Sequence, residues 1–352
     1  MTNDTTSIAS GLSRRTLLRA GAALGAAGII GMPHIAKAAD TVRFSLEFRI
    51  YGGNAPFFYG VEKGFFKDQG IDIQLDGSAG SGEAVRRIAA GTHEFGTADA
   101  ATVVEFVGRN PNVGLKSTMM VFDNFPAVIL SLKRKPLTKM EQLVGAKIGV
   151  GASSAATKIL PALLKAHNID PNKINFVNID VKLRDTMLLK GEVDAVIAFD
   201  YTAIFNLMES GVKQEDIVLL YYSENGFAFP GNSLVASKAM METKPDLTKR
   251  LAKAIARCWV EGNKDREGCI AAVTKRERLL DPTVELARLN FVYQKHVLTK
   301  NVLANGLGAI TQGRLKAGMD ILSESLELTP PPTVAQVYDD QFLPPIEDRR
   351  FS

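Results

Sequence analysis

The chain has 352 residues, of which 46% are hydrophobic and 23% charged, and its formal net charge is +4. Residues 1–38 hold four basic residues against one Asp, so without them the formal charge falls from +4 to +1 and both signs are interspersed. Such a chain lacks the clustered Lys and Arg that bind nucleic acid, and no nucleic-acid partner is expected. Residues 39–352 are long enough for two α/β domains.

The first 38 residues are typical of an export signal. Ser13-Arg14-Arg15-Thr16-Leu17-Leu18 matches the twin-arginine pattern, and a weakly apolar run over 20–30 follows it. This run is too short for a bilayer-spanning helix, which needs roughly 20 apolar residues. Ala36-Lys37-Ala38 is a candidate cleavage site, and no Cys lies near it to carry a lipid anchor. We therefore expect a periplasmic mature protein; the alternative is an N-terminal helix with a chance Arg pair.

From Thr41 onward, apolar β-type runs alternate with amphipathic helical segments, which predicts an α/β protein with parallel sheets. A first block is expected to hold strands over 42–48, 71–75, 95–98 and 115–122, and helices over 56–66 and 81–90. A second block is expected to hold strands over 128–132, 147–150, 174–178, 195–199 and 217–221, with helices near 154–167, 182–190 and 202–210. After a strand over 233–236 the chain is predicted to be helical until Thr329-Pro330-Pro331-Pro332, which should end regular structure before a polar tail.

Two loops rich in Gly and Ser stand between a predicted strand and a predicted helix. Ligands of α/β sheets lie at the carboxyl ends of strands, where helix N-termini present unpaired N–H groups to anions and carbonyl oxygens. The loops 77–82 and 151–157 therefore supply the candidate ligand contacts Ser78, Gly80, Ser81, Ser153, Ser154 and Thr157. The alternative is an ordinary capped connection. Gly77 and Gly82 have phosphate-loop spacing, but Glu83 stands where the Lys is required, so a nucleotide is not expected.

Further candidates follow other predicted strands: Tyr51 and Asn54 after the first, Asp99 after the third, Asn124 after the crossover strand, and Asp200 with Tyr201 in the second block. A tyrosine could stack on a planar ligand, while Asp or Asn would fix its polar edge. For each, a capped turn is the alternative.

Arg49 poses a separate question. Beside a cleft, it would pair bidentately with a sulfonate or carboxylate. Alternatively it is a surface residue balanced by Glu47 on the same strand face, and Glu47 itself would suit a cationic or amino-bearing ligand. The sequence leaves these alternatives open.

Catalytic and cofactor motifs are not apparent. His93, His167 and His296 have no Cys or carboxylate at metal-ligand spacing, and neither Ser153 nor Ser154 lies in a nucleophile elbow. Cys258 and Cys269 would stand about 16 Å apart on one continuous helix, too far to bond, although Gly262 and Gly268 could break it. We expect core thiols, no metal, no cofactor and no enzyme activity.

Four stretches in order resemble the periplasmic substrate-binding proteins of nitrate, sulfonate and taurine ABC importers, a group that also binds thiamine-pyrimidine precursors. They are Ala55-Pro56-Phe57-Phe58-Tyr59-Gly60-Val61-Glu62-Lys63-Gly64-Phe65-Phe66; Gly70-Ile71-Asp72-Ile73 with Gly80-Ser81-Gly82 and Gly91-Thr92-His93-Glu94-Phe95-Gly96; Leu143-Val144-Gly145-Ala146-Lys147-Ile148-Gly149-Val150; and Leu188-Leu189-Lys190-Gly191-Glu192-Val193-Asp194-Ala195. The yeast-type pyrimidine synthases share this fold, but their cysteine-rich motif has no counterpart here.

The resemblance implies a two-lobed periplasmic binding protein fold of type II, with two hinge strands and the ligand in the cleft between the lobes. Lobe 1 would comprise 39–126 and 233–328, lobe 2 would be 127–232, and 329–352 would form a tail. It implies a monomer that delivers a small organic anion, a sulfonate or carboxylate, to an ABC permease. A neutral heteroaromatic such as a thiamine-type pyrimidine, or a role reporting to a sensor, are the alternatives.

Overall fold

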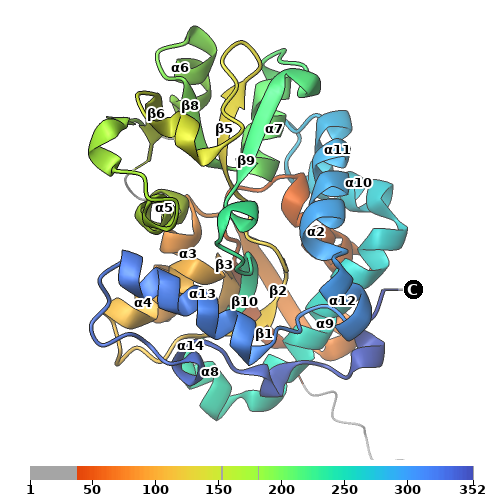
Figure 1. Ribbon diagram of the computed structural model, residues 1–352. Helices are drawn as coiled ribbons and strands as arrows, with labels where there is room; N and C mark the ends of the chain where they lie inside the picture. The colour runs from red at the N-terminus through yellow and green to blue at the C-terminus, as the bar shows by residue number, and fades with distance from the viewer. Residues whose placement is uncertain (1–37, 152–153, 181, 352) are drawn as a thin grey trace, which may run out of the picture. The chain divides into compact units, whose positions relative to one another are not determined.

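A computed structural model describes residues 38–151, 154–180 and 182–351 (Figure 1). Ala39–Ser352 forms one compact unit. The twin-arginine motif, the apolar run after it and Ser153 lie outside the described residues, and so does most of the candidate cleavage site.

The first sheet has the strand order β2-β1-β3-β10-β4. Its strands are β1 (Asp40–Ser45), β2 (Ile71–Asp76), β3 (Phe95–Asp99), β4 (Lys116–Met120) and β10 (Asn232–Ala236). β1 is parallel to β2 and β3, whereas β10 is antiparallel to β3 and β4. With α2 (Ala55–Glu62), α3 (Ser81–Ala89), α4 (Ala100–Arg109) and the C-terminal helices, this sheet forms what we call the first lobe.

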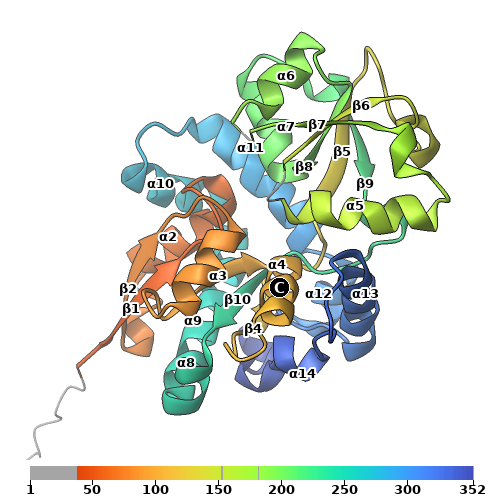
Figure 2. The same ribbon diagram turned by 90° about the vertical axis from the view of Figure 1, so that its left-hand side faces the viewer.

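The second sheet has the strand order β7-β6-β8-β5-β9 and forms the second lobe with its helices (Figure 2). Its elements are β5 (Ala127–Leu132), β6 (Lys147–Val150), α5 (Ala155–Ala166), β7 (Asn175–Asn178), α6 (Arg184–Lys190), β8 (Ala195–Phe199), α7 (Asp200–Glu209) and β9 (Ile217–Tyr221). Every residue of the apolar strand β5 is buried, as expected of a strand covered on both faces. The two-lobed α/β architecture agrees with the fold predicted from the sequence.

The expectation of parallel sheets is wrong in part, because both sheets are mixed. β5 runs antiparallel to β8 and β9, as β10 does to β3 and β4. Residues 121–126 lead directly from β4 into β5, and 222–231 lead from β9 into β10. The two segments cross between the sheets in opposite directions, so β10 returns antiparallel to β4, and β9 runs antiparallel to β5.

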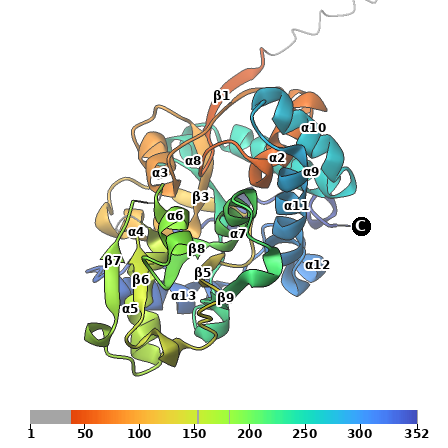
Figure 3. The same ribbon diagram turned by 90° about the horizontal axis from the view of Figure 1, so that it is seen from above.

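The C-terminal part of the first lobe is mostly helical, as predicted. It contains α8 (Lys238–Thr243), α9 (Pro245–Lys264), α10 (Arg266–Arg276), α11 (Pro282–Val292), a π-helical turn η7 (Tyr293–Val297), α12 (Lys300–Asn305), α13 (Gln312–Ser325) and α14 (Val334–Val337). α11 packs against α7 of the second lobe (Figure 3), and α5 packs against α13.

The prediction that regular structure ends at the proline run is wrong. α14 follows the prolines, and Tyr338 and Phe342 are buried. The Asp339 N–H donates to the carbonyl of Ser117 in β4 at 3.0 Å. Apolar side chains within the polar tail bury against the first lobe, so the tail is part of that lobe's surface.

Cys258 and Cys269 are both buried and unbonded, as predicted for core thiols. The helix that carries them is interrupted, because α9 ends at Lys264 and Asp265 caps the next helix by accepting from the Gly268 N–H at 2.9 Å. Both helices pack against α2, where Gly60 faces the Cys258 side chain.

Candidate functional site

Two tyrosines from different lobes meet face to face. Tyr51 follows β1 in the first lobe, and Tyr201 lies in the first turn of α7 in the second. Their ring centroids are 6.0 Å apart with an interplanar angle of 9°, and both side chains are buried. The structure therefore brings together two of the residues predicted to contact a ligand.

Glu47 is hydrogen-bonded to one of these two tyrosines, Tyr51. Its carboxylate accepts hydrogen bonds from the Tyr51 hydroxyl at 3.0 Å and from the Thr97 hydroxyl at 2.6 Å. Burial raises the pKa of Glu47, although these hydrogen bonds oppose the shift. Glu47 thus faces the interior, and the suggestion that it balances Arg49 on one strand face is wrong because both residues lie beyond the end of β1.

Arg49 is exposed and reaches from the first lobe to the second. Its guanidinium donates to the side-chain oxygen of Asn206 on α7 at 3.4 Å and lies 5.8 Å from the centre of the Phe48 ring. An exposed cation at the boundary between the lobes can meet an incoming anion, so this placement keeps the anion-binding alternative open.

Asp99 ends β3 and caps α4. One carboxylate oxygen accepts from the N–H groups of Ala101 at 3.0 Å and Thr102 at 3.2 Å, and its own N–H donates to the Ser81 hydroxyl at 3.0 Å. The residue is fully buried, and burial raises its pKa to about 7. Ser81 and Asp99, both predicted as contacts, are therefore neighbours.

The negative charges of three carboxyl groups act on Tyr201. The pKa of its phenol lies well above the ordinary value, chiefly through burial and then through the negative charges of Glu47, Asp99 and Asp200. Asp200 is fully buried and lies 2.9 Å and 3.1 Å from His296 Nε2, so this carboxylate has a partner from the first lobe. We call Glu47, Tyr51, Thr97, Asp99, Asp200 and Tyr201 the interlobe cluster.

Arg288 on α11 ties the two lobes together beside the interlobe cluster. Its side chain is 1% exposed and donates to Glu285 at 2.9 Å and to the Tyr201 carbonyl at 2.8 Å. Glu285 in turn accepts from the Gly52 N–H next to Tyr51. Sequence reasoning missed this pair, because the sequence only shows an acid and a base three residues apart on a predicted helix.

The two predicted Gly/Ser loops are only partly described. In the first, Ser78 bonds to its own loop at Gly80, and the Ala79 N–H donates to Glu83 at 2.7 Å. Gly80 precedes α3 with φ 142°, a backbone conformation that favours glycine. In the second loop, Ser154 precedes α5 without a side-chain cap bond, and the buried Thr157 hydroxyl has no hydrogen-bond partner among the described residues.

Asn54 and Asn124 have local roles. Asn54 accepts from the Tyr51 N–H at 3.2 Å and donates to the Arg49 carbonyl at 3.2 Å, which shapes the loop that holds Tyr51. Asn124 donates to the Lys295 carbonyl at 2.8 Å. Asn54 thus supports the backbone of Tyr51 in the interlobe cluster, whereas the bond of Asn124 goes to no member of that cluster.

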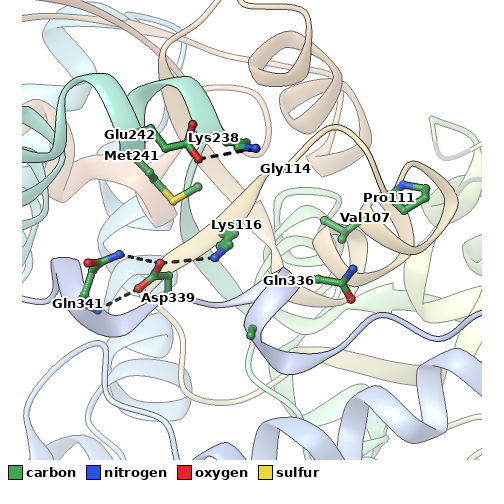
Figure 4. A pocket seen from close by; sticks show the side chains of 11 residues that line it. Val107, Pro111, Gly114, Lys116, Lys238, Met241, Glu242, Gln336, Asp339 and Gln341 are labelled. Atoms are coloured by element: carbon green, nitrogen blue, oxygen red, sulfur yellow. Dashed lines mark hydrogen bonds and ion pairs between the residues drawn. The ribbon is translucent and has the colours of Figure 1, made fainter.

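A separate hollow of about 420 Å³ lies in the first lobe between α4, α8 and the C-terminal segment (Figure 4). Lys116 pairs with Asp339 at 3.5 Å, and Lys238 pairs with Glu242 at 3.7 Å. Gln341 also donates to Asp339 at 2.8 Å. The charged groups that line this hollow form ion pairs with one another. The hollow is therefore a weaker candidate ligand site than the interlobe cluster.

Comparison with known proteins decides the family. The family model described as NMT1/THI5 like matches residues 53–265, more than half of the chain. The chain belongs to the NMT1/THI5-like family. A curated relative, the riboflavin-binding protein RibY of Chloroflexus aurantiacus, is 20% identical over 204 residues, which are 58% of this chain and 57% of the relative.

Solved structures share the fold at low identity. The alkanesulfonate-binding protein SsuA from Xanthomonas axonopodis pv. citri, bound to MOPS, has a TM-score of 0.65 at 14% identity and covers 86% of this chain and 99% of its own. SsuA from Escherichia coli, a periplasmic aliphatic sulphonate binding protein, has a TM-score of 0.65 at 13% identity. The match covers 84% of this chain and 96% of that protein. The desulfurization enzyme DSZB has a TM-score of 0.57 at 14% identity, and the match covers 86% of this chain and 97% of the enzyme.

Two features, one typical of membrane proteins and one of metalloproteins, are not found in the described residues. No helix there is both long and apolar enough to cross a membrane. No group of three or more His, Cys, Asp or Glu side chains in the described part of the chain is arranged to hold a metal ion.

Proposed function

We propose that this protein is the periplasmic solute-binding component of an ABC importer and that it delivers a small organic anion, a sulfonate or carboxylate, to the permease. The carrying observation is that polar side chains from both lobes converge on the Tyr51–Tyr201 contact, at the carboxyl ends of β1, β3 and β8. Membership of the NMT1/THI5-like family and the likeness to sulfonate-binding proteins support the proposal.

The mechanism is a shift between open and closed arrangements of the lobes. A ligand that contacts both lobes only when they are closed favours the closed form by its difference in affinity. We propose that the anionic group binds between Arg49, Ser81 at the start of α3 and the loop before α5. The other proposed contacts are Tyr51, Asn54, Ser78, Gly80, Asp99, Asn124, Ser153, Ser154, Thr157, Asp200 and Tyr201.

A neutral heteroaromatic ligand is the second candidate. The riboflavin-binding relative and the rings of Tyr51, Tyr201 and Phe122 favour it. These rings pack against one another, however, so a planar ligand would first have to separate the two tyrosines. A ligand-binding subunit that reports to a sensor would need the same site; a permease and ATPase encoded beside the protein supports import, and a sensor kinase alone would favour the sensor.

We do not assign an enzymatic reaction, although the desulfurization enzyme shares the fold. Burial raises the pKa of the Cys258 thiol well above its ordinary value, and burial likewise raises the pKa of Cys269 to about 12. A nucleophilic cysteine needs an accessible thiolate, which neither residue offers.

A ligand screen tests the proposal. The mature chain, residues 39–352, is heated with sulfonates, carboxylates, nitrate, aromatic acids and pyrimidines, and we expect anions to raise the Tm by several degrees. Binding to the native state stabilises by roughly 2.7 kcal/mol at one hundred times the Kd. Shifts confined to pyrimidines would favour the second candidate, and the absence of any shift would count against a solute-binding role.

Replacing Ser81 separates ligand contact from a structural turn. Ser81→Trp should weaken binding of the stabilising anion at least tenfold, because the indole would fill the space at the start of α3. Ser81→Ala removes the hydroxyl that accepts the Asp99 N–H and that we propose contacts the anion, without adding bulk, so it should weaken binding less than Ser81→Trp. The two variants should have similar Tm values without ligand. Parallel losses of Tm and affinity in Ser81→Trp would support the capped-turn alternative.

Export by the twin-arginine route is a separate part of the proposal. Changing Arg14 and Arg15 to Lys should leave the precursor in the cytoplasm, measured by cell fractionation. Secretion of the double variant at the level of the parent would contradict the assignment.

A further inference from the structure

Arg184 on α6 is a buried cation with few partners. Its side chain is 9% exposed, and in the described part of the chain its only acceptor is Asp185, at 2.8 Å from Nε and 3.2 Å from Nη2. A guanidinium has five N–H donors, and burying a charge is costly unless it is well bonded. Adjacent residues of a helix do not normally face each other, so Asp185 is an unusual partner. Within the described ranges, Arg184 keeps N–H donors for a further acceptor.

Arg288 shows how this fold satisfies a buried arginine by itself. Its guanidinium is 1% exposed and donates to four residues from both lobes, which are Glu285, Glu209, Tyr201 and Thr202. These acceptors use the whole fork of Arg288, so a ligand is not needed there. Arg184 is nearly as buried, but the described residues offer it one acceptor residue instead of four. The contrast indicates a partner for Arg184 from outside the chain.

Arg184 is connected to Arg49 of the first lobe through two side chains. Asn206 on α7 accepts from Arg49 at 3.4 Å, and its amide donates to Asp185 at 3.3 Å. We call Arg49, Asn206, Asp185 and Arg184 the two-arginine group. The Arg49 side chain is exposed and that of Asp185 is 19% exposed, so the group is open to solvent at the boundary between the lobes. A solute therefore reaches it without entering a sealed core, and meets two cations and one carboxylate.

The two-arginine group lies at the strand ends of both sheets. β6, β7 and β8 are parallel neighbours, so the segments that follow them, including α6 and α7, leave the second sheet at the same edge. In the first lobe, Arg49 lies beside the loop 77–82. The Ser78 N–H donates to the Phe48 carbonyl at 3.0 Å, and a Cβ atom at Gly77 would lie 3.5 Å from the Arg49 Cα. Ligands of α/β sheets bind at such strand ends.

We propose that Arg184 binds the acidic group of the transported solute through its fork, and that Asp185 occupies this fork until the solute arrives. This inference rests on the proposed function and adds the second-lobe residue that holds the anion, with Arg49 on the other side. The two bonds from Asp185 are those that a guanidinium makes to a carboxylate, so Asp185 stands where the acidic group of the solute would bind. Once displaced, Asp185 keeps the amide of Asn206 as a partner.

Asp185 thereby acts as a competitor built into the binding site. The solute gains the difference between its own bonds to Arg184 and those of Asp185, so the affinity is lower than the fork alone would give. A neutral solute does not displace Asp185, because Arg184 would exchange a charged acceptor for an uncharged one. An anion bound to Arg49 and Arg184 together contacts both lobes, which favours their closed arrangement.

Calorimetric titration with ethanesulfonate, benzenesulfonate, propionate and benzoate tests both residues. Asp185→Asn keeps the size of the side chain and leaves Arg184 only a neutral acceptor, so we expect it to bind at least one of these anions threefold or more tightly than the parent. Damage to the fold cannot produce tighter binding. Arg184→Met keeps the apolar stem and removes the fork, so it should bind the same anion at least tenfold more weakly, as expected when a charge-assisted hydrogen bond is lost.

Two further variants serve as controls. Asp216→Asn removes the same charge beside Lys133, at the opposite edge of the second sheet, and should bind the anions within twofold of the parent. In the double variant Arg184→Met with Asp185→Asn, the gain from Asp185→Asn should disappear, because no fork remains to be freed.

The outcomes separate this inference from the proposed function. Unchanged or weaker binding in Asp185→Asn, an equal gain in Asp216→Asn, or a gain that persists in the double variant overturns the competition. Unchanged affinity in Arg184→Met overturns the contact with Arg184. In each of these cases anion import stands, because the parent binds an anion. If the parent binds none of the four anions, the inference fails. A wider screen in which only pyrimidines bind then favours the second candidate, and one in which nothing binds contradicts a solute-binding role.

Discussion

Arg288→Ala should lower the free energy of unfolding by about 3–5 kcal/mol, the range found when one member of a buried ion pair is removed. The change leaves Glu285, which is 1% exposed, as a buried carboxylate without its guanidinium. It also removes the donor to the Tyr201 carbonyl, and with it a direct link between the lobes. Urea denaturation, monitored by fluorescence of the single Trp259, measures the loss.

Two further variants give this prediction its controls. Arg257→Ala breaks an exposed pair with Asp68 and should cost no more than about 1 kcal/mol. In the double variant Glu285→Gln with Arg288→Met, the glutamine oxygen still accepts from the Gly52 N–H and no buried charge remains, so most of the lost stability should return. A loss in Arg288→Ala as small as that in Arg257→Ala would show that Glu285 finds another partner or becomes protonated cheaply.

Gly60→Ala should destabilise the protein by roughly 1–3 kcal/mol, the usual cost of forcing an extra methyl group into a packed core. A Cβ atom at this position would lie 2.1 Å from the Cys258 sulfur and 3.2 Å from the Phe66 ring. The helical preference of alanine over glycine opposes this cost but is smaller than a clash with a fully buried side chain. Thermal and urea unfolding of the variant both report the difference.

Gly313→Ala is the matched control, since Gly313 lies in α13 and a Cβ atom there meets nothing within 4 Å. It should raise stability by up to about 1 kcal/mol. Cys258→Ala removes the sulfur that Gly60→Ala would contact, so the two changes together should cost less than the sum of their separate effects. Strict additivity would mean that α2 moves away from α9 to relieve the contact.

The order of the elements could be predicted because apolar periodicity is local. β6, β8 and β9 begin and end where the sequence places them, since each is a mainly apolar run next to a turn. α4 was not predicted, although Asp99 is a good N-cap for its apolar face. The direction of β5 and β10 is not visible in their composition, because a buried strand has the same apolar character in either orientation.

Candidate site residues could be predicted from the sequence only where their position at the end of a strand determines where they lie. Tyr51, Asp99, Asp200 and Tyr201 were chosen because they follow strands, and the structure groups them. The hydrogen-bond partners of the buried side chains could not be predicted, because they are far apart in the sequence. Examples are Glu47 with Thr97, Asp200 with His296, and Arg288 with the Tyr201 carbonyl.

The position of β10 sets the order in which the lobes can be completed during synthesis. β10 lies between β3 and β4 in the first sheet, yet it follows the whole second lobe in the chain. Until residue 236 has left the ribosome, β3 and β4 each present an unpaired edge, and such edges promote aggregation. The second lobe, by contrast, has all its strands by Tyr221. The nascent second lobe is therefore complete while the first is still open, and any factor that shields nascent chains would be needed most by β3 and β4.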